Sequence, residues 1–68
     1  MVFYITISQD EDGMYIAVCP SIPGCVSQGT TEKEALANIR DAIRECLLAR
    51  SEAGMPLTVE VHRIKVTV

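Results

Sequence analysis

The sequence predicts a small α+β domain with the order β-β-β-α-β, in which one helix packs on one face of a small sheet. Residues 2–9, 14–19 and 57–68 alternate apolar and polar side chains with the period of two that is typical of strands. Residues 31–53 instead place apolar side chains three and four positions apart, which is the spacing of an amphipathic helix. At 68 residues the chain has room for one domain, residues 1–68.

The first two strands are expected to form a hairpin around an acidic turn. Asp10, Glu11 and Asp12 separate them, and Gly13 can adopt the positive φ that such turns need. A four-residue loop starts the second strand at Met14, and the isoleucines of both strands then share one face. That face is predicted to lie under the helix, and its members are Phe3, Ile5, Ile7, Ile16 and Val18. The other face, which one helix cannot cover, carries Tyr4, Tyr15, Ala17 and Cys19.

A rigid loop is expected between the second and third strands. Pro20 and Pro23 restrict the backbone there, and the pair Pro23-Gly24 suits the centre of a type II turn. Residues 25–28 are long enough for a brief third strand, which Gly29 closes.

The helix is expected to begin at Thr31 and to continue for about 22 residues. Thr31 and Glu34 form a capping box, which places the N-cap at Thr31. Gly54 fits the C′ position and Pro56 prevents continuation. The predicted apolar stripe consists of Leu36, Ile39, Ile43, Cys46 and Leu47.

Residues 57–68 predict a last strand. The alternation changes phase at His62-Arg63, which suggests a bulge or two half-strands with different partners. A right-handed crossover through the helix would place this strand beside the first one and parallel to it.

Composition excludes several classes of function. The net charge of −3 and the three aromatic residues argue against a direct nucleic-acid binder. No apolar run is long enough to span a membrane and no basic secretory leader begins the chain, so a cytoplasmic location is expected. The chain has an odd number of cysteines and no C-x-x-C pair, and His62 is its single histidine. The cysteines are Cys19, Cys25 and Cys46. We therefore expect no disulfide framework, no metal and no cofactor.

No catalytic constellation stands out, so the chain is not expected to be an enzyme. No cysteine or serine has a neighbouring group that would activate it, and consecutive turn carboxylates do not converge on one metal ion. The carboxylates are unevenly placed, since residues 1–32 contain no lysine or arginine. An acidic half indicates a basic partner surface, and the alternative is a solvated turn that only aids solubility.

A domain of this size buries only about 60% of the surface of its unfolded chain. A monomer would also leave one sheet face and one edge strand bare. We therefore expect a dimer or higher homo-oligomer, formed through that face or through residues 59–68.

The segment from Asp10 to Leu36 resembles the signature of HicB-type antitoxins. The shared pattern is an acidic turn with glycine, a tyrosine-bearing strand, P-x-I-P-G-C, a short polar strand, and G-x-T-x-x-E-A-L opening a helix. The matching residues, which mark turns and the capped helix, are Gly13, Tyr15, Pro20, Pro23, Gly24, Cys25, Gly29, Thr31, Glu34, Ala35 and Leu36.

The resemblance implies a partly degraded ribonuclease-H-like fold without its catalytic carboxylates. It also implies an antitoxin of a type II toxin–antitoxin system, whose partner is a HicA-type toxin, a small basic ribonuclease that cleaves mRNA. The toxin-binding residues are then expected to be Asp10, Glu11, Asp12, Tyr15 and Ile22.

Many members of that family carry a C-terminal DNA-binding domain. This sequence ends at Val68 within the predicted last strand, so no DNA-binding domain is expected. The alternative function is that of an orphan homo-oligomeric regulatory or ligand-binding module with no toxin partner.

Overall fold

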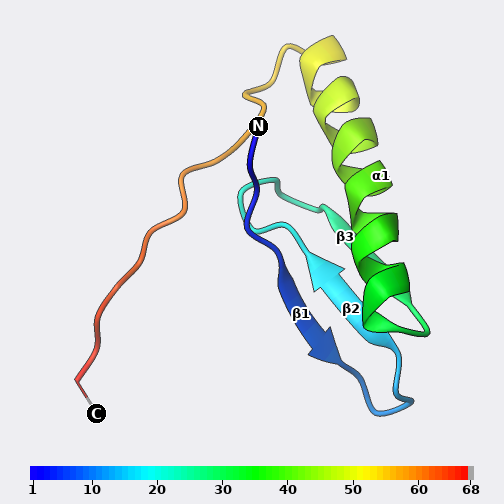
Figure 1. The fold of residues 1–68 in the computed structure, drawn as a ribbon. Helices are drawn as coiled ribbons and strands as arrows, with labels where there is room; N and C mark the ends of the chain where they lie inside the picture. The colour runs from blue at the N-terminus through cyan, green and yellow to red at the C-terminus, as the bar shows by residue number, and fades with distance from the viewer. Residues whose placement is uncertain (68) are drawn as a thin grey trace.

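A computed structural model describes residues 1–67. This part of the chain contains β1 (Thr6–Gln9), β2 (Tyr15–Val18), β3 (Val26–Gly29) and α1 (Glu32–Glu52). The strands form one antiparallel sheet in the order β1-β2-β3, and α1 packs on one face, chiefly over β3 and then β2 (Figure 1). The predicted α+β class, with three strands followed by one helix, is confirmed.

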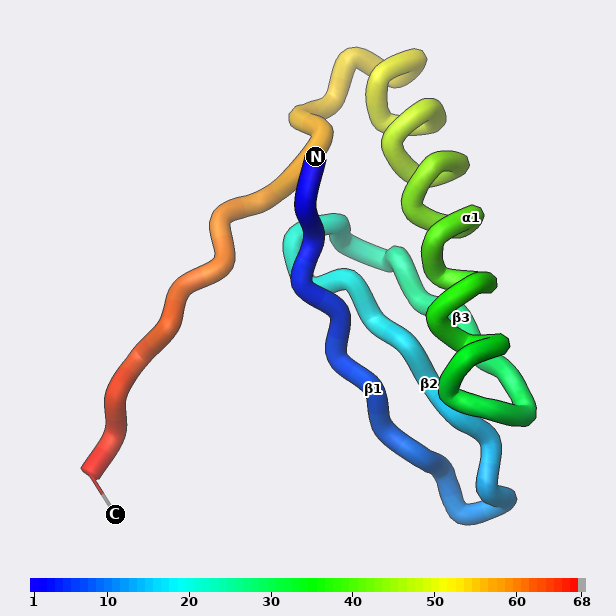
Figure 2. The backbone as a smooth tube through the Cα atoms, in the orientation of Figure 1, coloured from blue at the N-terminus to red at the C-terminus, as the bar shows by residue number. Residues whose placement is uncertain are grey.

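The predicted fourth strand is absent from residues 57–67. Figure 2 shows this segment leaving the end of α1 and running away from the sheet as an extended chain. One backbone hydrogen bond holds its start, from the Val59 N–H to the Ser21 carbonyl at 2.7 Å. The ribonuclease-H-like architecture implied by the resemblance is not shown either. Alternation gives residues 57–67 a preference for extended backbone, but a strand needs a neighbour, and residues 1–67 do not supply one. Val68 lies outside the described residues.

The register of the first hairpin differs from the prediction by one residue. Gln9 lies opposite Tyr15 rather than Met14, and Ile7 lies opposite Ala17 rather than Ile16. A one-residue shift exchanges the two faces of β2. The helix-facing side of β2 therefore consists of Tyr15 and Ala17, with Cys19 directly after the strand, and Ile16 and Val18 lie on the open side.

Close packing of the helix explains why the small residues of β2 face it. Ala17 and Cys19 are fully buried with Ala35 and Ile39 of α1. Phe3, Ile5 and Ile7 pack against the edge of this core, as predicted. Tyr4 and Tyr15, which were expected on one face, are separated: Tyr15 packs against the core, and Tyr4 is 87% exposed.

The helix begins and ends as the sequence predicts. Thr31 is the N-cap, and its hydroxyl accepts a hydrogen bond from the Glu34 N–H at 3.1 Å. The Glu34 carboxylate reaches back to the Thr30 N–H, at 3.2 Å, which satisfies a second free donor. At the other end Gly54 has φ +69°, and the Met55 N–H donates to the Arg50 carbonyl at 2.9 Å. This is the Schellman arrangement that a C′ glycine allows.

The loop before β3 contains the predicted type II turn. The Cys25 N–H donates to the Ile22 carbonyl at 3.1 Å, and Gly24 has φ +77°. The turn directs the Ile22 and Cys25 side chains into the core, where both are buried.

Gly29 sets the distance between β3 and α1, which yields a stability prediction. A Cβ atom there would lie 2.5 Å from the backbone nitrogen of Ala35, so the helix would have to move. Gly29→Ala is expected to lower the free energy of unfolding by about 3 kcal/mol, at the upper end for overpacking. Gly24→Ala, which meets no atom within 4 Å, is expected to cost about 1 kcal/mol through its positive φ. Urea denaturation of both variants measures this, and equal losses would contradict it.

Candidate protein-interaction surface

The acidic turn at the tip of the β1–β2 hairpin is held in shape by one of its own carboxylates. The Asp10 carboxylate accepts hydrogen bonds from the backbone N–H groups of Asp12 and Met14, both at 2.9 Å. The Asp10 N–H donates to the Met14 carbonyl, at 2.9 Å, and Gly13 adopts φ +83°. The turn contains five loop residues where the prediction allowed four, which matches the one-residue shift in register.

Glu11 and Asp12 present their charges to solvent from this turn. Both are exposed, and neither takes part in the ion pairs found within residues 1–67, which join Arg44 to Asp41 and His62 to Glu60. The side chain of Gln9 braces the turn by donating to the Gly13 carbonyl at 3.1 Å. The turn therefore offers an ordered patch of negative charge that no basic side chain of the described chain neutralises.

Of the two remaining predicted contact residues, Tyr15 lies next to this patch and Ile22 lies away from it. Tyr15 begins β2 directly after the turn and is half-buried on the helix side of the sheet. Ile22 lies beyond the other end of β2 and is 1% exposed, so its side chain belongs to the core. The Ile22 side chain therefore offers almost no surface for the toxin contact that the sequence suggested. From sequence alone, the apolar Ile22 between two prolines could not be distinguished from an exposed anchor.

The three thiols gather in and beside the core. Cys19 and Cys25 are buried, Cys46 is half-buried, and all three are free. Burial raises the pKa of the Cys25 thiol from 9.0 to about 12, and a hydrogen bond with Cys46 adds to the effect. A thiol with so high a pKa is protonated at neutral pH, so it is a poor nucleophile and a poor metal ligand.

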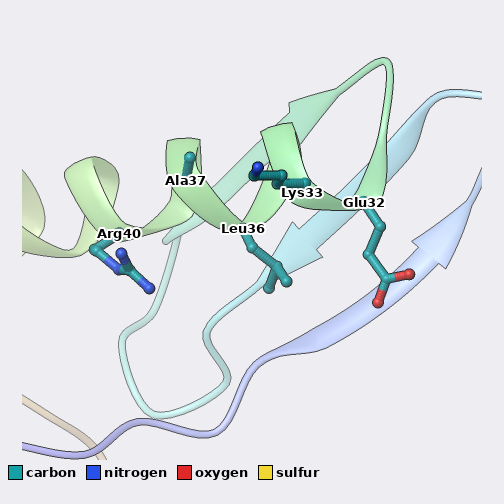
Figure 3. A pocket seen from close by; sticks show the side chains of 5 residues that line it. All are labelled: Glu32, Lys33, Leu36, Ala37 and Arg40. Atoms are coloured by element: carbon teal, nitrogen blue, oxygen red, sulfur yellow. The ribbon is translucent and has the colours of Figure 1, made fainter.

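A groove runs beside α1 on the side facing β1. Figure 3 shows one hollow along it, lined by Glu32, Lys33, Leu36, Ala37 and Arg40, all from α1. A second hollow of about 540 Å³ shares Leu36 and Arg40 and extends to Phe3 and Ile5, which precede β1 in the chain. Its lining is mainly apolar, and its charged members are Arg40 and Arg44 of α1.

Across positions 1–67, no group of three or more histidine, cysteine or acidic side chains is arranged to hold a metal ion. The one helix among these residues, α1, lacks the apolar length that crossing a bilayer requires.

Comparison with known proteins places these features in a family. The model of the "HicB_like antitoxin of bacterial toxin-antitoxin system" family matches residues 3–67. The chain belongs to the HicB-like antitoxin family. Members of this family are typically non-catalytic.

Curated relatives of this HicB-like chain extend across archaea and bacteria. A UPF0150 protein of Archaeoglobus fulgidus is 36% identical over 67 residues, which cover 96% of this chain and 97% of the relative. A UPF0150 protein of Thermoplasma acidophilum is 52% identical over 44 residues, covering 65% of this chain and 64% of the relative. One from Synechocystis is 49% identical over 45 residues, covering 66% and 65%. The chain thus spans slightly less than two thirds of the latter two. No solved structure matches the chain.

The residues that carry the resemblance to HicB-type antitoxins act in the structure as architectural residues. Gly13 and Gly24 occupy positive-φ positions, Gly29 lies against α1, and Thr31 and Glu34 cap the helix. The surface residues Glu11 and Asp12 have no such backbone role. The residues of the family pattern therefore specify the turns and the capped helix of the fold, and they say less about the binding surface.

The double role of Asp10 yields a prediction on stability. Asp10→Ala removes the acceptor of two backbone hydrogen bonds and is expected to lower the free energy of unfolding by about 1 kcal/mol. Asp10→Asn keeps an oxygen in the same place and is expected to remain close to the unsubstituted protein. Urea denaturation at neutral pH compares the two, and a similar loss in both variants would contradict the capping role.

The raised pKa of Cys25 yields a prediction on pH dependence. Above pH 9.0 the unfolded chain loses the thiol proton, whereas the folded protein keeps it until about pH 12. The free energy of unfolding is therefore expected to fall as pH rises from 9.0 toward 12. Denaturation at a series of pH values should show a shallower fall in Cys25→Ala than in the unsubstituted protein. Identical slopes of the free energy of unfolding against pH in the two proteins would contradict the assignment of this pH dependence to Cys25.

Proposed function

We propose that this HicB-like protein is an antitoxin that binds and masks a small HicA-type toxin, an mRNA-cleaving ribonuclease. The observation that carries the proposal is the family match over residues 3–67, which includes every element of the fold. In this function the protein acts on its partner by binding alone. The partner acts on mRNA in the cytoplasm, a reducing compartment that suits the three free thiols.

Electrostatics support the turn as the toxin-binding surface. A ribonuclease needs a basic surface to hold the phosphates of its substrate. The turn at residues 10–12 presents ordered carboxylates, and residues 1–32 carry no lysine or arginine that would oppose them. Placed against the RNA site, this patch would compete with phosphate for the same basic groups. We propose Asp10, Glu11, Asp12 and Tyr15 as the contact residues, with Asp10 also holding the shape of the turn.

The binding step can be tested by affinity capture of the protein from its source cells, followed by identification of the bound chains. We expect a small basic ribonuclease, whose cleavage of an mRNA is suppressed when this protein is added. Recovery of this protein alone would favour an orphan homo-oligomeric module. A captured partner without ribonuclease activity would also contradict the antitoxin role.

A charge-reversal pair tests the surface. The double variant Glu11→Lys/Asp12→Lys is expected to weaken binding of the captured toxin by about 10-fold or more, and to reduce its dependence on salt. Asp10 is left unchanged in this variant because it holds the turn. Titration calorimetry at low and high salt provides the measurement.

The matched control is Glu45→Lys/Glu52→Lys, which changes the net charge equally on exposed positions of α1. We expect it to bind almost as tightly as the unsubstituted protein. Equal weakening by both double variants would assign the effect to net charge and would contradict a localised site.

A further inference from the structure

The segment after α1 exposes apolar side chains that a water-soluble surface rarely carries. We call residues 57–67 the arm. Ile64 is 81% exposed and Val66 is 70% exposed, and neither belongs to the hydrophobic core or to the residues packed against it. Leu57, Val59 and Val61 at the start of the arm are also exposed. A contiguous set of exposed β-branched residues marks an interaction site.

The arm has the pattern of a half-buried strand beyond residue 62. Ile64 and Val66 alternate with Arg63, Lys65 and Thr67, so one face is apolar and the other polar. Its backbone is extended but has no strand neighbour within residues 1–67. Such a segment has the unpaired backbone N–H and C=O groups and the alternating side chains of an edge strand, but it is not part of a sheet.

The sheet offers one open edge that fits the arm. The edge at β3 is covered by α1, where the Asn38 side chain donates to the Gln28 carbonyl at 2.8 Å. The edge at β1 lies away from α1 (Figure 1). Residues 1–9 carry no charged side chain, and therefore none of the lysines that commonly protect such edges.

The groove beside β1 has the size and chemistry to take the apolar face of an added strand. The hollow of about 540 Å³ lies between the start of β1 and α1. Its aliphatic and aromatic lining consists of Phe3, Ile5, Leu36, Ile39, Ile43 and Leu47. A strand paired with β1 would direct alternate side chains into this hollow, because Phe3 and Ile5 already point to that side.

We propose that the arm of one copy adds as a fourth strand to the β1 edge of a second copy, placing Ile64 and Val66 in its groove. A second copy is favoured over the arm's own β1 by the position of the arm. The Val59 N–H is bonded to the Ser21 carbonyl, and Val61 lines a shallow hollow that Val2 and Tyr4 also line. Beyond these contacts the arm diverges from its own β1 (Figure 2).

The positions of the charged side chains are consistent with an arm that binds the groove of a second copy. With Ile64 and Val66 in the groove, Arg63 and Lys65 lie on the opposite face, away from the Arg40 and Arg44 side chains that line the groove. The arrangement therefore buries the apolar face of the arm without placing like charges together. It also covers the bare sheet edge in both copies, as expected for a closed pair with twofold symmetry.

Light scattering and matched variants of the full chain test the proposal. The unsubstituted protein is expected to be a dimer at micromolar concentration. Ile64→Lys and Val66→Lys are each expected to weaken association by about 100-fold, because each places a charge in both apolar grooves. Thr67→Lys, on the polar face of the same arm, is expected to remain dimeric. Amide NMR spectra confirm that every variant is folded.

Isotope-filtered NMR then distinguishes an arm that pairs with β1 of the second copy from an arm that pairs with β1 of its own chain. Labelled and unlabelled chains are unfolded together and refolded. Contacts between the Ile64 or Val66 methyl groups of one chain and Phe3 or Ile5 of the other would support the exchange. A monomeric unsubstituted protein would overturn it, as would a dimer unaffected by Ile64→Lys and Val66→Lys, or arm contacts confined to one chain. The inference is independent of the toxin, because no partner other than this chain enters the experiment.

Discussion

Helix α1 lies so close to β3 that a methyl group on Gly29 would stand 2.5 Å from the backbone of Ala35. This close approach requires small residues on both sides of the contact, and the buried Ala17, Cys19 and Ala35 meet that requirement. The larger Ile16 and Val18 are consequently directed to the open face. The position of the helix over β3 and β2 also decides which sheet edge is covered and which remains open. The arrangement of the whole domain follows from this one contact between backbones.

The hairpin turn combines a structural role for Asp10 with the proposed binding role of three consecutive carboxylates. Asp10 uses its side chain to hold the backbone of the turn, and the exposed side chains of Glu11 and Asp12 extend from that backbone. A backbone that is already held loses less conformational entropy on binding than a mobile one, which favours recognition of a basic partner. The family supports a toxin as that partner, and the proposed surface requires no buried ionisable group, metal or cofactor.

The open edge at β1 and the exposed arm are complementary features of the same chain. A domain of this size has a limited core, and an added strand from a second copy would enlarge it by covering Phe3, Ile5 and the adjoining side of α1. The acidic turn lies at the far end of β1 from these residues. The proposed self-association through the arm and the proposed binding of a toxin at the turn would therefore use different parts of the molecule.

The sequence by itself determined the features that depend on neighbours in the chain. The capping box at Thr31 and Glu34, the type II turn at Pro23-Gly24 and the C′ glycine at Gly54 are each specified within a few residues, and all three are confirmed. The acidic turn was also visible as a candidate site, although its binding role stays a proposal. Only the tertiary structure decided the hairpin register, the burial of Ile22 and the unpaired state of the arm. Periodicity reports that a strand has two faces but not which face meets the helix, because that choice depends on how closely distant backbones pack.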